Sequence, residues 1–481
     1  MTWQPDLALA PQSDKPLFLQ IAQSIARDIR RGRFEPNTRL PGSRTLARRL
    51  LVHRNTVTQA YAELEAQGWV SAQPARGVFV AAEIPRVELE SQTGTTGLTQ
   101  DRVGFVLPPF EPSVQLPMQA HGLKLYGGIP DLTFFPAKAL ARAYRNALVL
   151  GPGKLLNYTG PAGHPKLRAA LSSMLRANRG IATSPEQVFV TRGSQMALYL
   201  AAKAALPVGA TIAVESFGYG PAWAAFRSAG ARLVPIPVDA HGLCTHTLSR
   251  LLARRRINAV YVTPHHQYPT TVMLSPARRL DLLRLAREHQ FAVIEDDYDH
   301  EFHYAGRPVL PLASDDHDGV VLYVGTLSKI LAPALRTGYL VAPTPVLKRV
   351  AELRGRIDRQ GDQVLELALA TLLEDGEVER HARRAQRRYH ERRDVLAGEV
   401  TRNLSACLSF TLPPGGMALW AKARGVDVDA WAQRCSQQGV HFVTAQTYAY
   451  DRRARPFVRL GFAALRPPQL KRAVQLMAQM L

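Results

Sequence analysis

The sequence reads VVLYVGTLSK at residues 320–329, and this stretch decides the fold of most of the chain. Its first five residues are apolar or aromatic, which is typical of a strand that is buried on both faces. Small residues then lead to a lysine, Lys329. A second stretch of this kind, FAVIEDDYD at residues 291–299, runs from an apolar strand into a group of acids. In an open α/β sheet, ligands bind outside the strand ends, so these polar residues mark a candidate site.

Three more short apolar segments precede these two, at residues 188–190, 211–214 and 259–262. Stretches with the pattern of helices separate them. Buried strands that alternate with helices predict an α/β fold, in which a mostly parallel sheet is covered by helices on both faces.

The residues at the strand ends suit pyridoxal phosphate. The amine of Lys329 can form a Schiff base with the aldehyde of this cofactor. The carboxylate of Asp296, 33 residues earlier, can keep the pyridine nitrogen protonated, so that the ring withdraws electrons. The loop TRGSQ at residues 191–195 opens a helix, and backbone N–H groups at a helix start bind phosphate. Further phosphate ligands are available from Thr326, Ser328 and Arg336.

The first eighty residues follow a different pattern. Leu17, Ile21, Ile25 and Ile29 recur every four residues and predict an amphipathic helix, which Gly32 ends.

Two shorter helices and a hairpin follow. Ser43 is placed to cap the second helix, and a third helix begins near Arg54 and ends at Gly68. Two short strands, at residues 69–72 and 78–80, then form a hairpin around a turn. This order of elements predicts a winged helix-turn-helix.

The third helix carries side chains that suit DNA. Arg54, Asn55 and Thr56 at its start can reach base edges and phosphates from a major groove. Arg44 near the start of the second helix suits a phosphate, and Arg76 at the wing tip suits a minor groove or the backbone. The neighbouring candidates are His53 and Gly77. The alternative is a small helical domain with solvated arginines, but the agreement of cap, turn, helix and basic hairpin favours DNA binding.

The formal net charge of +21 fits a nucleic-acid partner but does not decide the matter. Residues 1–82 hold 11 Lys and Arg against six Asp and Glu, so most of the surplus lies elsewhere. Seven arginines between Arg380 and Arg393 favour a solvated helix, with a supplementary DNA-tracking surface as the alternative.

The composition also bears on location. The sequence has no membrane-length apolar stretch and no export signal, and its three cysteines are scattered. We therefore expect a cytoplasmic protein with no membrane partner.

Residues 83–117 break both patterns, because they contain a polar, small segment at 91–97 and then several prolines. We expect a linker there, between a DNA-binding domain at residues 1–82 and a second domain at residues 118–481.

The motifs LPGSRTLA at residues 40–47, VHRNTV at 52–57 and YAEL at 61–64 resemble those of the GntR family of bacterial regulators. The wing departs from that family, because ARGVFV at 75–80 stands where Gly-x-Gly-Thr-Phe-Val is usual. Wing geometry is therefore less firmly predicted than the helices.

From about Gly122 to Leu481 the chain resembles the fold type I aminotransferases. With GGIPD at residues 127–131, EDDYD at 295–299 and GTLSKILAPALR at 325–336, the whole chain resembles the MocR subfamily. Members of that subfamily join a GntR-type head to an aminotransferase-like effector domain.

The resemblance implies a role for each matching residue. Lys329 would be the Schiff-base lysine, Asp296 the partner of the pyridine nitrogen and Arg459 the ligand of an amino-acid α-carboxylate. Tyr158 would reach the phosphate of the neighbouring subunit, which implies a homodimer. The remaining cofactor contacts would be Tyr298 at the ring hydroxyl, Tyr219 stacked on the ring, and Gly193, Ser194, Gln195, Thr326, Ser328 and Arg336 at the phosphate.

Two segments depart from the family pattern. In TPHHQYPTT at residues 263–271, His265 stands where serine is common, Thr271 stands where glycine is usual, and the asparagine that aminotransferases place at the ring hydroxyl is absent. His266 is the candidate substitute. Histidines and acids also gather at residues 299–303, but their spacing matches no zinc motif, so no metal site is expected.

Three functions fit these features. The first is a transcription regulator that binds double-stranded DNA and senses a small amine, an amino acid or pyridoxal phosphate through Lys329. The second is an active aminotransferase with an accessory DNA-binding domain. The third is a carrier of pyridoxal phosphate, which leaves the winged domain without a use. The sequence favours the regulator, with at most a partial transamination reaction.

Overall fold

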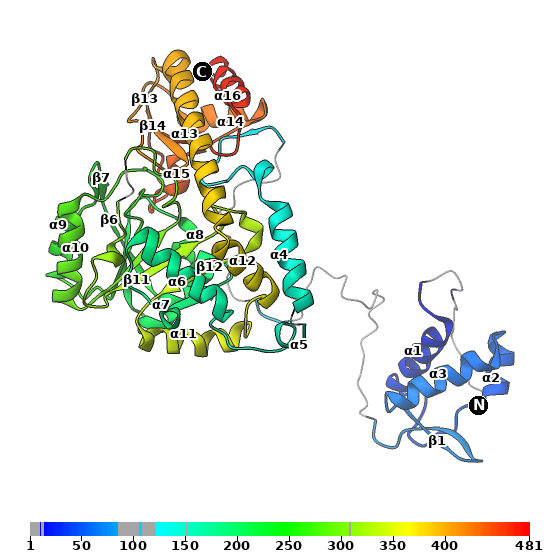
Figure 1. Ribbon diagram of the computed structural model, residues 1–481. Helices are drawn as coiled ribbons and strands as arrows, with labels where there is room; N and C mark the ends of the chain where they lie inside the picture. Colours follow the sequence, from blue (N-terminus) through cyan, green and yellow to red (C-terminus); the bar gives the residue numbers. More distant parts are fainter. Residues whose placement is uncertain (1–9, 11–13, 85–104, 108–120, 151, 307–308) are drawn as a thin grey trace. The chain divides into compact units, whose positions relative to one another are not determined.

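The computed structural model describes residues 10, 14–84, 105–107, 121–150, 152–306 and 309–481. The chain divides into two compact units, Met1–Phe110 and Glu111–Leu481, which we call the N-terminal unit and the large unit (Figure 1). Most of the expected linker, residues 83–117, lies outside the described residues, so its limits stay a prediction.

The N-terminal unit contains the predicted helices and hairpin. Its core is made by fully buried side chains, among them Ile21, Leu46 and Val57, which the three helices contribute. The elements are α1 (Leu17–Arg30), α2 (Ser43–Leu50), α3 (Arg54–Ala66) and the antiparallel strands β1 (Val70–Gln73) and β2 (Gly77–Val80).

One detail of this unit corrects the sequence analysis. Ser43 does not cap α2, because Gly42 holds the N-cap position and no side chain caps the helix. The Ser43 hydroxyl instead accepts a hydrogen bond from Nε of Arg54, at 3.3 Å, and so joins the starts of α2 and α3.

A seven-stranded sheet forms the centre of the large unit. Its order is β4-β12-β11-β10-β9-β5-β6, and every neighbouring pair is parallel except the two pairs that contain β12. The strands are β4 (Val188–Thr191), β5 (Thr211–Glu215), β6 (Arg232–Ile236), β9 (Ala259–Val262), β10 (Ala292–Asp297), β11 (Val321–Thr326) and β12 (Gly338–Val341). The five predicted strands are confirmed, and the α/β class with them. The sequence analysis missed β6 and β12.

Helices cover both faces of this sheet (Figure 1). Alternate strand residues feed two separate cores, because successive side chains of a strand point to opposite faces. One core takes α7 (Ser194–Ala205), α8 (Gly220–Ser228) and α11 (Thr344–Ile357). The other takes α4 (Ala137–Leu150), α6 (Pro165–Arg179), α9 (Thr245–Leu252), α10 (Pro276–His289) and α12 (Gln363–Glu374).

The C-terminal part of the large unit, which we call the C-terminal lobe (residues 377–481), is a smaller α+β layer. Its antiparallel sheet has the order β13-β14-β17-β16 and a core of its own. Its elements are α13 (Glu377–Leu404), β13 (Leu408–Phe410), β14 (Ala418–Ala423), α14 (Val428–Gln437), β15 (Val440–His441), β16 (Val443–Thr444), α15 (Ala445–Tyr448), β17 (Phe457–Gly461) and α16 (Pro467–Gln479). The short elements elsewhere are β3 (Leu123–Lys124), α5 (Pro152–Leu155), β7 (Val238–Asp239) and β8 (Gly242–Leu243).

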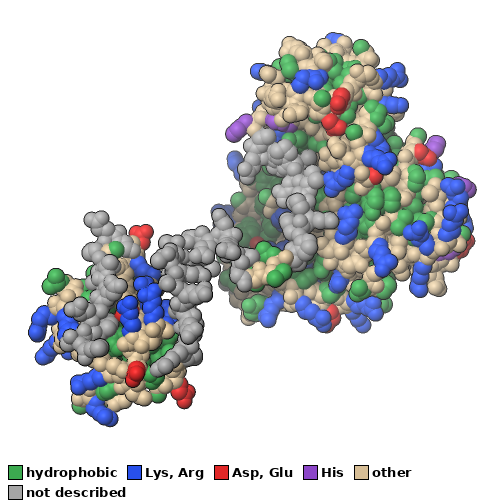
Figure 2. All heavy atoms as spheres, turned by 180° about the vertical axis from the view of Figure 1, so that it is seen from behind, with side chains coloured by type: hydrophobic (Ala, Val, Ile, Leu, Met, Phe, Trp, Pro, Cys, Tyr) green, Lys and Arg blue, Asp and Glu red, His purple; other side chains and the backbone are tan. Residues whose placement is uncertain are grey.

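The arginine-rich segment lies in α13. The sequence analysis favoured a fully solvated helix, but two of the seven arginines, Arg392 and Arg393, are buried. Arg392 is buried and pairs with Asp131 at 2.7 Å, and Nη1 of Arg393 donates to the carbonyl oxygen of Pro413 at 2.9 Å. Arg392 therefore joins the C-terminal lobe to Asp131, and Arg393 forms a contact within the lobe. Lys and Arg side chains are scattered over the visible face of the large unit and form no single patch (Figure 2). Across the described ranges, no helix combines the length and apolarity that a bilayer crossing requires.

Candidate functional site

Lys329 lies just beyond the end of β11, at the carboxyl edge of the central sheet. Its Nζ donates a hydrogen bond to the carbonyl oxygen of Gly128 at 2.7 Å. Burial and the positive charge of Arg459 together lower the pKa of Lys329 to about 8, although Asp299 and Asp296 oppose that shift. A larger fraction of this amine is therefore neutral, and hence nucleophilic, near neutral pH than for an ordinary lysine.

Asp296 lies at the end of the neighbouring strand, β10. Its Oδ2 accepts a hydrogen bond from the hydroxyl of Tyr261 at 2.8 Å. Its Oδ1 is buried and has no hydrogen-bond partner among the described residues. Burial raises the pKa of Asp296 to about 7, while Tyr261 and Lys329 oppose that rise. A buried carboxylate oxygen with a missing partner fits the ring N–H of a pyridinium.

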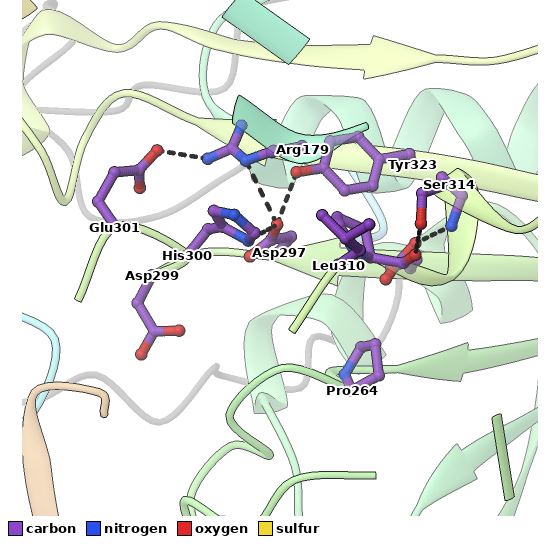
Figure 3. A network of polar contacts seen from close by, with 12 residues as sticks. Arg179, Pro264, Asp297, Asp299, His300, Glu301, Leu310, Ser314 and Tyr323 are labelled. Carbon is purple, nitrogen blue, oxygen red and sulfur yellow. Dashed lines mark hydrogen bonds and ion pairs between the residues drawn. The ribbon is translucent and has the colours of Figure 1, made fainter. Parts of the chain in front are cut away.

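The next residue, Asp297, contacts protein groups through its Oδ2, while its Oδ1 is buried without a hydrogen-bond partner among the described residues. Figure 3 shows that it meets Arg179 and His300, and that it accepts a hydrogen bond from Tyr323. Despite burial, His300 and Arg179 hold the pKa of Asp297 well below its ordinary value. Adjacent strand residues point to opposite faces of the sheet. Asp296 is therefore available to a ligand of the site, whereas Asp297 contacts Arg179, His300 and Tyr323.

Arg459, on β17 of the C-terminal lobe, is also buried and incompletely paired. Its Nε donates to the carbonyl oxygen of Pro269 at 3.2 Å, and the ring of Tyr268 lies 4.5 Å from Cζ. Both terminal nitrogens lack a hydrogen-bond partner within the described part of the chain. A Cβ on Gly127 would lie 1.6 Å from Nη1, so glycine leaves the space that the guanidinium occupies. A planar cation with two open donors fits a carboxylate.

The start of α7 is the place where the sequence analysis expects the phosphate of the cofactor, a candidate cradle. Gly193, at the N-cap, has a φ of 83°, and a Cβ there would lie 2.7 Å from Nη2 of Arg336. The same nitrogen of Arg336 donates to the carbonyl oxygen of Arg192 at 3.0 Å. The fold thus places a guanidinium beside the first N–H groups of a helix, which bind no helical carbonyl. Ser194 is half-buried and Gln195 is exposed at this helix start.

The hydroxyl residues of the cradle, Thr326 and Ser328, come from the end of β11 and the loop that follows it. The backbone N–H of Ser328 donates to Oγ1 of Thr326 at 3.1 Å, and both residues are buried. The geometry fits a bound phosphate, because hydroxyls, helix N–H groups and a guanidinium come from three adjacent segments.

The predicted tyrosines differ in their placement. Tyr219 packs edge-to-face on Tyr268, with ring centroids 5.5 Å apart, and burial raises its pKa to about 12. The hydroxyl of Tyr298 donates to the carbonyl oxygen of His266 at 2.9 Å. Tyr158 is 76% exposed, with its ring 5.0 Å from the guanidinium of Arg359. Its reach into a neighbouring subunit stays a prediction.

The ring of His266 is directed at other side chains of this segment. Its Nδ1 contacts Oδ1 of Asp299 at 2.8 Å, and its ring stacks on that of His303. Only its backbone oxygen contacts Tyr298. The His266 ring therefore faces Asp299 and His303. That His266 contacts the ring hydroxyl of the cofactor stays a prediction.

Two neighbours of the site were missed in the sequence. Tyr261 orients Asp296, and the tyrosine Tyr268 covers Arg459. Tyr261 lies in the middle of the strand segment AVYV, where its spacing gives no sign of a polar role. Tyr268 precedes a proline in a loop, a position without a recognisable signal.

The candidate DNA residues of the N-terminal unit are exposed. Arg44, Arg54 and Asn55 lie at the starts of α2 and α3. His53 is exposed too and caps α3, because its Nδ1 accepts a hydrogen bond from the N–H of Asn55 at 3.2 Å. The other candidates are Thr56, half-buried in α3, Arg76, exposed in the turn of the hairpin, and Gly77, whose φ is 117°.

Comparisons with known proteins agree with both halves of this description. The family model of aminotransferase class I and II matches residues 128–476, and that of the gntR family of bacterial regulatory proteins matches residues 17–80. The chain is 30% identical to the probable rhizopine catabolism regulatory protein MocR of Rhizobium meliloti, over 97% of this chain and 94% of that protein. This chain belongs to the MocR subfamily of GntR-type regulators.

Other relatives extend over each part of this MocR-type regulator. The HTH-type transcriptional regulator TauR of Rhodobacter capsulatus is 31% identical, over 98% of both chains. Among solved structures, the α-aminoadipate aminotransferase LysN of Thermus thermophilus, in complex with N-(5'-phosphopyridoxyl)-L-leucine, superposes with a TM-score of 0.70. It is 26% identical, and the match covers 75% of this chain and 92% of that one. The MocR-type regulator therefore has an N-terminal DNA-binding domain, followed in the chain by a domain with the fold of a pyridoxal-phosphate-dependent family.

Proposed function

We propose that this MocR-type transcription regulator carries pyridoxal phosphate on Lys329 and senses a small amine, an amino acid or pyridoxal phosphate itself. The observation that carries the proposal is a set of buried, incompletely paired groups around Lys329. Asp296 has one free carboxylate oxygen and Arg459 has two free guanidinium nitrogens, counted over the described residues. Leaving such groups unpaired costs about 1–3 kcal/mol each, so a ligand that pairs them is favoured.

Each part of the site has a distinct task. When bound, pyridoxal phosphate supplies an aldehyde that bonds covalently to an amine and a ring that withdraws electrons. Lys329 offers the amine, and Asp296 would hold a proton at the ring nitrogen. The start of α7 and Arg336 would hold the phosphate. Arg459 would bind the carboxylate of an incoming amino acid.

The sensing step follows from competition for the same position. An incoming amino acid would compete with Lys329 for the aldehyde of the cofactor, so the lysine amine would be released as the amino acid attaches, and Arg459 would bind its carboxylate. Because Arg459 belongs to the C-terminal lobe and Lys329 to the central sheet, such a ligand bridges the two parts of the large unit. A coupling of about 1–3 kcal/mol to DNA binding is typical for allosteric proteins.

The protein is expected to act as a homodimer on double-stranded operator DNA. The exposed ring of Tyr158 is available for a neighbouring subunit, and two winged heads are needed for two half-sites. Gel filtration of the cofactor-loaded protein at several concentrations tests this, and a monomer at all of them would contradict it.

The cofactor claim is tested by borohydride trapping. The purified full chain is incubated with pyridoxal phosphate, reduced and digested, and the peptide that contains Lys329 is expected to carry the cofactor. Lys329→Ala is expected to lose this label and the near-visible absorbance. The control is Lys348→Ala, which alters an exposed lysine on α11. Label on other lysines alone would overturn the proposal.

The competing function is a working aminotransferase. The features that favour it are the intact lysine, aspartate and arginine positions. Steady-state keto-acid formation faster than about 1 s⁻¹, near the low end of ordinary enzymes, would favour this alternative. A protein that loads pyridoxal phosphate but does not shift its own upstream DNA in gels would instead be a carrier.

A further inference from the structure

Four histidines gather where two neighbouring strands end. His265 and His266 follow β9, while His300 and His303 follow β10, and all four are only 1–4% exposed. The ring centroids of His265 and His266 lie 4.4 Å apart, and those of His266 and His303 lie 6.0 Å apart. One ring nitrogen from each of His265, His266 and His303 lies within 4.8 Å of the other two.

Only two of the six ring nitrogens of these three residues have a hydrogen-bond partner among the described residues. Nδ1 of His266 is paired with Asp299 at 2.8 Å, and Nε2 of His303 donates to the carbonyl oxygen of Ala305 at 2.6 Å. The opposite nitrogen of each ring, and both nitrogens of His265, have no hydrogen-bond partner among the residues that the structure describes. A buried polar nitrogen without a partner is unfavourable, so a ligand that pairs with it is favoured.

We propose that His265, His266 and His303 bind one divalent transition-metal ion of the zinc class. The ligand atoms would be Nε2 of His266, Nδ1 of His303 and one ring nitrogen of His265. Asp299 would act behind the metal, because a carboxylate that accepts from the far nitrogen of a histidine orients the ring and raises its basicity. Imidazole nitrogens select zinc, copper or nickel over magnesium and calcium, which prefer oxygen.

The geometry requires a small closure. In a tetrahedral zinc site with Zn–N distances of about 2.0–2.1 Å, the ligand nitrogens stand about 3.3–3.4 Å apart. The three ring nitrogens, which lie within 4.8 Å of one another, must therefore draw together by up to about 1.5 Å when the ion binds. His300 is left out of the set, because its Nδ1 faces Asp297 at 3.3 Å (Figure 3).

The trio also lies on the seam between the sheet and the C-terminal lobe. His303 forms a β-bridge with Gly415, and the N–H of Gly416 donates to the carbonyl oxygen of Phe302 at 2.7 Å. A Cβ on Gly415 would lie 2.2 Å from Nε2 of His266, so only glycine fits against that ring. An ion at the trio would lie beside this seam, and its ligand His266 also accepts the hydrogen bond of Tyr298 through its carbonyl oxygen.

Cobalt is the probe for this site, because Co²⁺ replaces zinc and reports its ligands through visible absorption. The full-length protein is stripped with a chelator and titrated with Co²⁺, with Zn²⁺ and Mg²⁺ as competitors. We expect one equivalent of Co²⁺ per chain, displaced by Zn²⁺ but not by Mg²⁺, and a higher thermal midpoint with Zn²⁺. A wild-type protein that takes up no saturating equivalent overturns the proposal.

Variants locate the ion. His303→Gln is expected to abolish the Co²⁺ spectrum, and Asp299→Asn to weaken affinity by about 10–100-fold. The matched control is His246→Gln, an exposed histidine on α9. Equal binding by His303→Gln and wild type overturns the proposal. If His303→Gln does not fold by circular dichroism, the wild-type stoichiometry and Asp299→Asn decide the question.

Discussion

At the scale of single residues, the site is defined by polar groups that the fold buries without satisfying. Asp296 keeps one open oxygen although its other oxygen is held by Tyr261. Arg459 keeps two open nitrogens although its Nε is bonded to Pro269. In each case one hydrogen bond fixes the orientation of the group and the remaining atoms are free for a ligand.

The lowered pKa of Lys329 predicts a pH dependence for cofactor attachment. Its pKa of about 8 lies below the ordinary lysine value, so the neutral amine grows with pH until about pH 8. The rate of attachment, followed by absorbance after mixing with pyridoxal phosphate, should rise about tenfold per pH unit below 8 and then level off. A rate that keeps rising to pH 10 would show an unperturbed lysine.

Arg459 is expected to distinguish amino acids from simple amines. Arg459→Gln removes a charge-assisted pair worth about 1.5–3 kcal/mol, so amino-acid affinity should fall by about 10–150-fold. The matching decarboxylated amine makes no such pair and should bind the variant and the wild type alike. Spectral titration with both ligands measures the difference. An equal loss of affinity for both ligands would show that Arg459 does not bind the carboxylate.

The sequence could predict Lys329 and Asp296 because each follows an unbroken apolar strand, whose end fixes where the next side chain lies. It could not predict Tyr261, since an aromatic residue inside a strand is normally core. Nor could it predict the histidine trio, because His265 and His303 stand far apart in the chain and meet only through the pairing of β9 with β10.

At the scale of elements, we assign the phosphate contact to the start of α7 and the DNA contact to the start of α3. At the start of α7, Gly193 leaves space for Arg336. At the start of α3, His53 caps the helix and Asn55 is exposed. Apolar periodicity predicted both helices, whereas β12 escaped because it is short and follows the Arg336 loop directly. The strand β6 escaped because its residues are half-exposed and include a proline.

Gly193→Ala tests the cradle at α7. The new Cβ would displace Arg336, so affinity for pyridoxal phosphate should fall by about 10–100-fold, the value of one charge-assisted hydrogen bond. Gly209→Ala is the control, because Gly209 has a similar φ of 77° and open space around it. Both variants should lose stability, by about 1–3 kcal/mol for the strained backbone alone, and only the first should lose affinity for pyridoxal phosphate. Equal affinities in the two variants would exclude Gly193 from the phosphate site.

Asn55→Ala tests α3 as the recognition helix. Loss of a base-edge contact is expected to cost about 1–3 kcal/mol in operator binding and to relax selectivity at one base position. Gln23→Ala, on the exposed side of α1, should bind as the wild type does. Fluorescence anisotropy with operator and mutated operator reads out both effects, and an unchanged affinity for Asn55→Ala would place the reading surface elsewhere.

At the scale of the whole molecule, the regulator consists of two compact units with separate cores, and regulation requires that ligand binding in one alters DNA binding in the other. Within the large unit the ligand-binding groups come from both the central sheet and the C-terminal lobe. A ligand that binds groups of both the central sheet and the C-terminal lobe favours the arrangement in which it contacts both. This difference in binding free energy between two arrangements is what allosteric coupling requires.

The most direct measurement is operator affinity of the cofactor-loaded full chain, with and without a panel of amino acids, for the wild type and Lys329→Ala. We predict that at least one amino acid changes the affinity of the wild type by about 5–150-fold, and that the same ligand leaves Lys329→Ala unaffected. If Lys329→Ala binds the operator with wild-type affinity and responds to the ligand as the wild type does, the lysine-borne cofactor is not the sensor.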